Sequence, residues 1–235
     1  MMKKNLAVLC VLGCFTSAAW AGNTIDPSNF NVQSEFKIFS EDLGAALSYK
    51  AVTPPAPLGI TGFDIGLEVT STKMRNLSIA TGGSNTLPVP KLHIYKGLPM
   101  NFDIGAVYSA VPSSNIKYYG GELRYAIMEG GMALPAVGVR GAITKLSGVN
   151  QLSLSTKSLD VSVSKGFLMF SPYAGAGVVW TDSTPNGIAG LTKESFQQTK
   201  VFIGGNLNLG LTNLALEVDK TGSANSVSAK VGFRF

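Results

Sequence analysis

The chain has one histidine, and it could take part in acid–base chemistry only with partners brought from other segments. His93 lies in the stretch 91–95 (KLHIY), where it alternates with two apolar residues. Hydrolysis by an activated serine needs a serine hydroxyl and a carboxylate within hydrogen-bond reach of the imidazole. Ser109 and Asp103 lie on the next predicted strand, and nothing in the sequence marks either as activated. We therefore interpret His93 as a polar wall residue and expect no enzyme, with a hydrolase that uses His93 as a further alternative.

A larger group of polar residues shares one property, which is that each alternates with apolar neighbours along a predicted strand. The group comprises Asp64, Glu68, His93, Asp103, Glu122, Arg124, Arg140, Asp160, Lys200, Glu217, Asp219, Lys230 and Arg234. If the strands close into a barrel, all of these side chains face its lumen. They would then form either a salt-bridged interior that blocks passage or the wall of a narrow, charge-selective channel.

Cofactor sites are not predicted. The glycine-rich pieces GGSN (82–85) and GNLNLG (205–210) lie within or between predicted strands. A phosphate loop would need a helix directly after it, with the helix N-terminus facing the phosphate. Neither these pieces nor any other spacing indicates a zinc, calcium or nucleotide site.

The elements that position these side chains are strands, because the hydrophobic period is two almost everywhere. In Phe63–Thr70, the side chains of Phe63, Ile65, Leu67 and Val69 point one way and the polar ones point the other. Such runs are roughly nine to twelve residues long, which is the length of a tilted strand that crosses a hydrocarbon layer. Unpaired backbone groups are costly in lipid, so the sheet must close. The alternative is a soluble periplasmic sandwich or barrel.

The predicted fold is therefore all-β, a transmembrane antiparallel up-and-down β-barrel of about twelve strands, within a range of ten to twelve. The alternation is weak over 90–98 and shifts phase over 152–157, which leaves a margin of one hairpin. Gly44–Val52 reads as a strand, and Phe30–Ile38 reads as a first strand or as part of a plug or helix. Short turns fall at one end, assigned to the periplasm, and longer loops fall at the other. An even number of strands would place both termini on the periplasmic side.

The N-terminus has the pattern of a secretory signal peptide. Lys3 and Lys4 precede the apolar run Leu6–Phe15, and the stretch 16–21 (TSAAWA) ends in a small-x-small cleavage pattern. We predict a signal peptide over 1–21, an N-terminal segment over 22–42 and a β-barrel domain over 43–235. An alternative for the start is lipoprotein acylation at Cys14, because 11–14 (VLGC) resembles an acylation box.

Composition supports an exported, membrane-exposed chain. Charged residues make up 14% of the sequence, below the roughly 25% of ordinary soluble domains, and the mean hydropathy is +0.23. Both cysteines lie within the predicted signal peptide, which excludes a disulfide framework and thiolate metal sites from the mature chain. The net charge of +5 falls further when Lys3 and Lys4 are removed, so nucleic acid is not expected as a partner.

The last strand resembles the C-terminal strand of Gram-negative outer-membrane β-barrel proteins. The chain ends on Phe235, and apolar residues alternate before it: Val227, Ala229, Val231 and Phe233. The resemblance implies a place in the outer membrane and assembly by the barrel assembly machinery, for which these five residues would be the signal. Outer-membrane lipid and lipopolysaccharide are the other implied partners. The blocks PLGITGFDIG, KGLPMNFDIGA and SKGFLMFSPYAGAGVVW look similar to those of uncharacterised members, so the resemblance implies no substrate.

Two rings of aromatic residues are expected where the barrel meets the membrane surfaces. The periplasmic ring would hold Tyr95, Phe102, Tyr125, Phe167, Phe170, Tyr173, Phe233 and Phe235, and the outer ring Tyr108, Tyr119 and Trp180. A barrel of about twelve strands is wide enough for a slim lumen. The predicted function is passive diffusion of small polar solutes through a narrow channel, and the alternative is a structural or adhesin-like envelope barrel without transport. The oligomeric state and the solute are not predicted.

Overall fold

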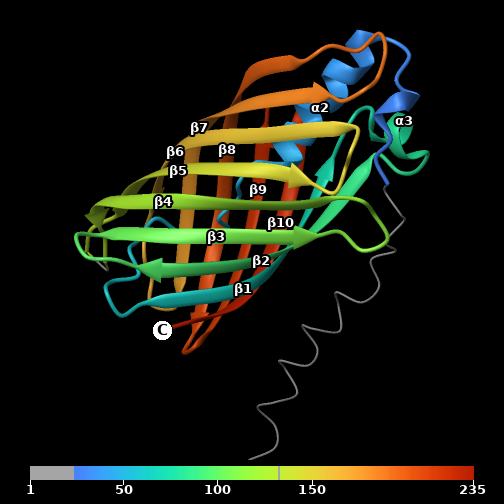
Figure 1. Ribbon diagram of the computed structural model, residues 1–235. Coiled ribbons are helices and arrows are strands. Elements are labelled where there is room, and N and C mark those ends of the chain that lie inside the picture. Colours follow the sequence, from blue (N-terminus) through green and yellow to red (C-terminus); the bar gives the residue numbers. More distant parts are fainter. Residues whose placement is uncertain (1–23, 132) are drawn as a thin grey trace, which may run out of the picture.

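A closed antiparallel barrel dominates the structure, which is a computed structural model describing residues 24–131 and 133–235 (Figure 1). Each strand pairs with its neighbours in sequence, and the first pairs with the last. Within the described residues the strands are β1 (Phe63–Lys73), β2 (Thr86–Gly97), β3 (Phe102–Ala110), β4 (Lys117–Glu129), β5 (Ala136–Ser147), β6 (Leu152–Ser164), β7 (Phe170–Pro185), β8 (Glu194–Leu209), β9 (Thr212–Thr221) and β10 (Ala224–Arg234). The all-β barrel class is confirmed, with ten strands rather than twelve. The predicted signal peptide lies outside the described residues.

Both strands that the sequence overcounted lie at the N-terminus. Residues Gln33–Leu47 form helix α2, and 48–52 follow without regular structure, so neither Phe30–Ile38 nor Gly44–Val52 is a strand. The barrel domain predicted from residue 43 has its first strand at Phe63. The strand-like alternation over Phe30–Ile38 competes with a helical spacing of apolar residues in the same region, and the helix forms.

The residues that α2 buries recur at helical spacing. Phe36, Phe39, Leu43 and Leu47 are separated by three or four positions and are almost completely buried. This apolar stripe lies on one face of a helix, and a strand would distribute the same residues over two faces. The physical reason for the wrong prediction is therefore a local ambiguity of period, which the contacts inside the barrel resolve in favour of a helix.

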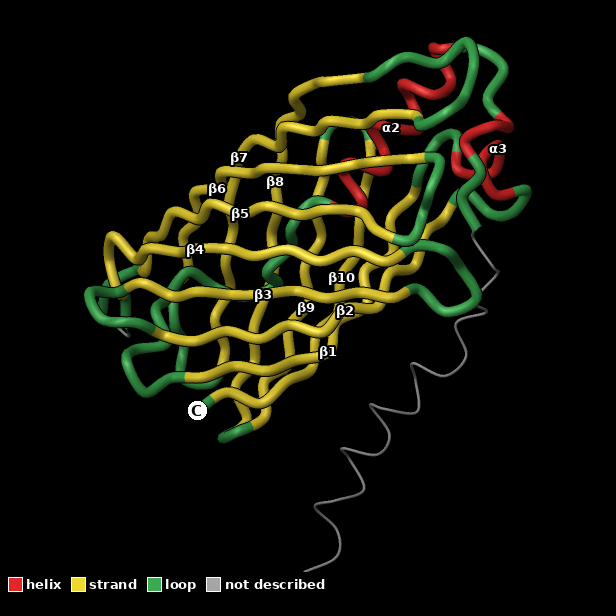
Figure 2. The backbone as a smooth tube through the Cα atoms, in the orientation of Figure 1, coloured by secondary structure: helices red, strands yellow, loops and turns green. Residues whose placement is uncertain are grey.

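Helix α2 lies inside the barrel rather than in its wall (Figures 1 and 2). It contacts β6, β7, β8 and β10. The chain then continues along the lumen: Arg234 donates a hydrogen bond to Thr53 Oγ1 over 2.6 Å, and the Leu58 amide donates to Asp103 over 3.1 Å. We call residues 24–62 the lumen segment.

The start of the lumen segment and the C-terminus of the chain lie at opposite ends of the barrel. We call the end that holds the β1–β2, β3–β4, β5–β6 and β7–β8 connections the loop end. There the Ile25 amide donates to Asn115 Oδ1, and Asn115 Nδ2 donates to the Ile25 carbonyl, each over 2.9 Å. At the other end, the turn end, Phe63 N donates to Phe235 O over 2.7 Å. An even strand number was expected to put both termini at one end. The lumen segment crosses the barrel once more and so reverses the side on which the described chain begins.

The polarity of the wall reverses along the strands while the alternation of side chains continues. On β6, the outward residues near the turn end are apolar and the inward ones polar; near the loop end the inward residues are apolar and the outward ones polar. The outward set runs Val163, Val161, Leu159, Lys157, Ser155 and Ser153. The inward set runs Ser164, Ser162, Asp160, Ser158, Thr156, Leu154 and Leu152. The inward and outward positions therefore continue to alternate through 152–157. What changes there is which of the two faces is apolar, and this change looked like a phase shift in the sequence.

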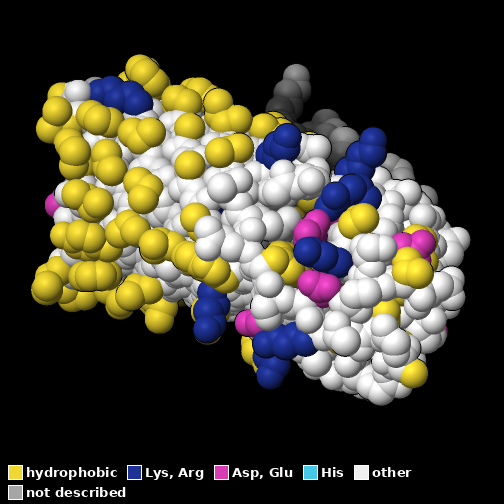
Figure 3. All heavy atoms as spheres, turned by 90° about the horizontal axis from the view of Figure 1, so that it is seen from above, with side chains coloured by type: hydrophobic (Ala, Val, Ile, Leu, Met, Phe, Trp, Pro, Cys, Tyr) yellow, Lys and Arg dark blue, Asp and Glu magenta, His cyan; other side chains and the backbone are white. Residues whose placement is uncertain are grey.

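This inversion divides the barrel into two parts. The membrane half, toward the turn end, has an apolar outer surface and a charged interior. The outer half, toward the loop end, has a polar outer surface and an apolar interior that packs on α2. Hydrophobic side chains gather over the part nearer the turn end, and charged groups lie beyond it (Figure 3).

The aromatic residues predicted for the two rings mark the edges of the apolar surface, with two exceptions. Tyr108, Tyr119 and Trp180 are exposed near its outer edge, and Phe167, Phe170, Phe233 and Phe235 are exposed near the turn end. Tyr95 and Tyr173 are buried inside the barrel instead, so their predicted place in the periplasmic ring is wrong. Both have the parity of inward residues on their strands. None of the helices in the described ranges is long and apolar enough to cross a membrane.

Candidate functional site: the filled lumen

The charged residues singled out from the sequence converge inside the membrane half. Asp64, Glu68, His93, Asp103, Glu122, Arg124, Arg140, Asp160, Lys200, Glu217, Asp219 and Lys230 are all buried, and the Arg234 side chain is 20% exposed. They come from nine of the ten strands, all except β7, and meet because every second side chain of a closed barrel points inward.

One acid of this group, Asp160 on β6, contacts two cations. Its Oδ2 lies 2.6 Å from Arg140 Nη2 on β5 and 3.2 Å from Lys200 Nζ on β8. Lys200 also donates to the carbonyl of Tyr49 in the lumen segment over 2.9 Å. One carboxylate therefore links two strands of the wall to the chain that fills the lumen.

Similar pairs continue around the wall. Asp64 lies 2.6 Å from Arg234 and 3.2 Å from Lys230, and Asp103 lies 2.7 Å from Arg124. Such buried pairs recover their desolvation cost only when the geometry satisfies most donors and acceptors. Glu122 is the exception: neither carboxylate oxygen accepts a hydrogen bond, and the nearest cation, Arg140 Nε, is 3.7 Å away.

His93 is held inside a polar cluster without access to solvent. Its Nε2 lies 2.7 Å from Glu68 Oε2, and its Nδ1 lies 2.9 Å from the Tyr95 hydroxyl. The two partners considered for a hydrolytic triad are engaged elsewhere. Ser109 donates to the Pro90 carbonyl over 2.6 Å, and Asp103 pairs with Arg124. The structure does not bring the three groups together.

The lumen segment adds a cation that the sequence did not assign to the lumen. Lys50 Nζ lies 2.8 Å from Asp219 Oδ1, and both side chains are buried. Lys50 had been placed in a predicted strand, and no signal in the sequence distinguishes it from a wall residue. With it, the described residues place seven acids and seven bases inside the membrane half. The acids are Asp64, Glu68, Asp103, Glu122, Asp160, Glu217 and Asp219, and the bases are Lys50, Lys91, Arg124, Arg140, Lys200, Lys230 and Arg234.

Helix α2 is attached to the wall by polar contacts as well as by its apolar face. The Ser40 and Ser183 hydroxyls lie 2.9 Å apart, and Thr144 donates to the Leu47 carbonyl over 2.9 Å. At the loop end, Arg75 Nη2 lies 2.8 Å from Asp42 Oδ1. The hydrogen bonds to Asp42 raise the pKa of the Arg75 guanidinium, so this group stays charged at physiological pH.

The residues of the predicted assembly signal form the outer face of β10. Val227, Phe233 and Phe235 are exposed, and Ala229 and Val231 are half-buried between neighbouring strands. Strand β10 pairs with β9 and with β1, so it closes the barrel. Recognition of these residues by the assembly machinery stays a prediction.

Comparisons with known proteins find similarity in fold only. No protein-family model and no curated protein sequence matches the chain. Among solved structures, the N-terminal β-barrel domain of Pseudomonas aeruginosa OprF is 13% identical, with a TM-score of 0.39, over 73% of this chain and 97% of that one. The β domain of the Bordetella autotransporter BrkA is 10% identical, with a TM-score of 0.43, over 75% of this chain and all of that one. Ail of Yersinia pestis is 12% identical, with a TM-score of 0.31, over 74% and 99%.

The architecture itself identifies the class. A closed antiparallel barrel with an outward apolar band, an aromatic ring at each edge and a polar interior is built for a bilayer. The fold is that of a transmembrane β-barrel. No group of three or more histidine, cysteine, aspartate or glutamate residues that could hold a metal occurs in 24–131 or 133–235.

Proposed function

We propose that the protein is a plugged outer-membrane barrel that serves as a structural or surface-interaction element of the envelope, and that it does not conduct solutes in this state. The observation that carries the proposal is the burial of the charged lumen residues. Lys200 and Asp64 have no exposed surface, although both lie on the inner wall. A water-filled channel would leave such side chains accessible to solvent.

The position of the lumen segment supports a role at the cell surface. Residues 24–32 lie at the loop end, and the longer connections of outer-membrane barrels face the exterior. The Gln33 side chain donates to Thr192 O over 3.1 Å and accepts from the Thr192 amide over 2.9 Å, so the segment is part of the loop-end surface. A stable, folded outer half with a polar exterior provides such a surface.

Passive diffusion of small polar solutes is the second candidate, because the interior of the membrane half is polar throughout. If α2 left the lumen, the seven acids and seven bases would line a charged passage. An enzymatic role is not proposed: His93 is fully buried, and its neighbours Glu68 and Tyr95 are buried with it.

Planar-bilayer recording separates the two candidates. The refolded protein should show no conductance steps at any voltage. Ser40 and Ser183 are close enough for a disulfide once both are replaced by cysteine, so the double variant S40C/S183C fixes α2 to β7. A channel that opens by release of α2 would conduct when this variant is reduced and stop when it is oxidised. That result would overturn the proposal in favour of the channel.

The single variant Ser40→Cys is the matched control, because it changes the helix but cannot form the cross-link. Its conductance should not depend on the redox state. Steps of equal size in all three proteins, oxidised or reduced, would also contradict the plugged barrel, since they would require a path past a fixed helix.

A further inference from the structure

Lysines mark the outer edge of the apolar surface on neighbouring strands. On β4, β5 and β6, the first polar outward residue beyond the apolar ones is a lysine in each case: Lys117, Lys145 and Lys157. Lys145 and Lys157 are exposed, and neither has a carboxylate within 4.0 Å among the described residues. The nearby Asp182 is already engaged with Lys193 at 2.9 Å. Neither lysine thus forms an ion pair, although Lys157 interacts electrostatically with Asp182, and both lie where the barrel leaves the membrane.

These two lysines border a groove on the outside of the wall. The groove has a volume of about 300 Å³, and we call it the lysine groove. Its lining includes Tyr119, Gly121, Ile143, Lys145 and Lys157. Each lysine is paired across the sheet with an aromatic residue, Lys145 with Tyr119 and Lys157 with Trp180. Aromatic rings at this level are typical of the boundary between headgroups and acyl chains.

Below the lysines the outer surface is open because two outward positions lack side chains. A Cβ on Gly141 would meet no atom within 4 Å, and one on Gly121 would meet only the Gly105 carbonyl at 3.5 Å. Gly141 lies between Leu123 and Leu159 in the ladder. The result is a shallow apolar trough that leads from the two cations toward the middle of the membrane half.

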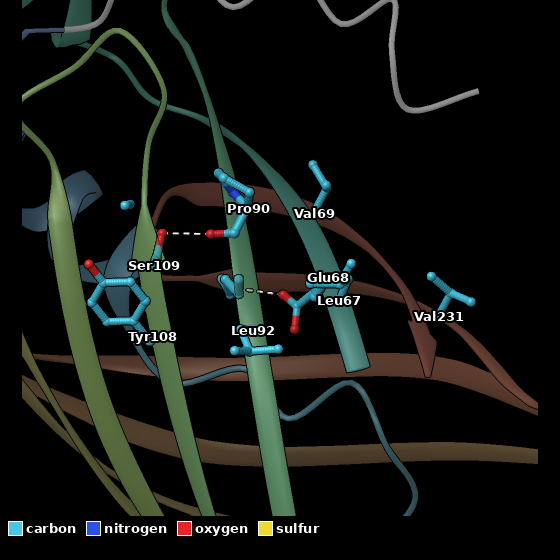
Figure 4. A pocket seen from close by; sticks show the side chains of 10 residues that line it. Leu67, Glu68, Val69, Pro90, Leu92, Tyr108, Ser109 and Val231 are labelled. Carbon is cyan, nitrogen blue, oxygen red and sulfur yellow. Dashed lines mark hydrogen bonds and ion pairs between the residues drawn. The ribbon is translucent and has the colours of Figure 1, made fainter. Parts of the chain in front are cut away.

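A second groove of similar size lacks the charge. It lies over β1, β2 and β3, has a volume of about 370 Å³ and is here called the seam groove (Figure 4). Its exposed lining includes Leu67, Leu92 and Tyr108. Lys91 also lines it but points inward, where its Nζ lies 2.5 Å from Glu68. The seam groove therefore offers apolar contact without a free cation.

We propose that the lysine groove binds an anionic, phosphate-bearing lipid of the leaflet at the loop end. The headgroup phosphate lies between Lys145 and Lys157, and one acyl chain follows the trough over Gly121 and Gly141. Charge complementarity selects the headgroup, because each lysine near the membrane surface attracts anionic lipid. The seam groove takes up acyl chains without regard to the headgroup.

Titration of the full-length protein in neutral detergent tests the site, with binding followed by native mass spectrometry. The probes are phosphatidylglycerol and phosphatidylcholine with identical acyl chains. We expect phosphatidylglycerol to bind more tightly, and K145Q/K157Q to weaken its binding by about 30-fold. Both substitutions are at exposed positions, and retention of the folded, heat-modifiable form on gels verifies that the variant is intact.

Lys220→Gln is the matched control, because Lys220 is also the first polar outward residue on its strand, β9, but lies beside a groove with one lysine. It should change the affinity by less than about twofold. Equal losses in K145Q/K157Q and Lys220→Gln would overturn the site in favour of general surface attraction. Equal binding of the two lipids would overturn the role of charge, and displacement of the lipid by inorganic phosphate would assign the site to a free anion.

Discussion

The membrane half and the outer half of the barrel share one alternation of side chains but have opposite polarity on the inward and outward faces. In the membrane half, outward residues such as Val161 are apolar and inward residues such as Asp160 are charged. In the outer half, inward residues such as Leu154 are apolar and outward ones such as Ser155 are polar. The backbone, the pairing and the sense of alternation do not change between them.

The difference teaches that the solvent on each side decides the polarity of a strand face. Outside the membrane half there is lipid, so its apolar side chains turn outward and its interior must balance buried charges against one another. Outside the outer half there is water, and α2 supplies an apolar interior, in which Phe36, Phe39 and Leu43 pack with Leu152 and Leu154. The outer half is thus built like a small soluble barrel around a helix.

The charged interior should be the most sensitive part of the molecule. Asp160→Ala would leave Arg140 and Lys200 without the carboxylate that both contact. Removing one partner from a buried cluster costs about 4 kcal/mol of unfolding free energy. Urea unfolding in lipid vesicles, followed by tryptophan fluorescence, measures the change. A loss below about 1 kcal/mol would show that water reaches these cations, contrary to a filled lumen.

Strand β6 also shows what the sequence could predict and what it could not. The period of two predicted the barrel class correctly, and the charged residues that it placed on one face are buried. The inversion at 152–157 looked like a change of phase, because a sequence alone does not show where the lipid ends and water begins. For the region of α2 the helical alternative is the one that forms, because its apolar neighbours, such as Leu154 on β6, lie far away in the sequence and come close only when the barrel closes.

A charge on the outside of the wall should distinguish the halves directly. Val161→Arg puts a cation into the apolar surface of the membrane half, and Ser155→Arg puts the same side chain on the outer half of the same strand. We expect the first to cost about 2 kcal/mol in unfolding free energy and the second close to zero. The measurement is urea unfolding in vesicles of a zwitterionic lipid. Equal costs would contradict a membrane edge between the two positions.

The smallest expected effect concerns the seam where the halves meet on β2. The β2–β3 ladder begins at Leu92 and Tyr108, whereas the other edge of β2 pairs with β1 as far as Thr86. Continued by two pairs, past Lys91 and Ser109, the β2–β3 register would bring Pro90 opposite Ala110. Proline has no N–H, so it cannot donate to the Ala110 carbonyl. The Pro90 carbonyl does face β3, where it accepts from Ser109 (Figure 4).

Replacing Pro90 with valine supplies the missing donor and should extend the ladder by one hydrogen bond. Any proline-to-valine change also loosens the unfolded chain, which offsets part of the gain. Pro88→Val has that same cost but no ladder to extend, so the difference between the two variants isolates the hydrogen bond. We expect Pro90→Val to be the more stable of the two by about 0.5 to 1 kcal/mol. Hydrogen exchange of Pro90→Val should show a protected amide at residue 90. Rapid exchange there would mean that the residues around the groove keep β2 and β3 apart, and not the missing N–H donor.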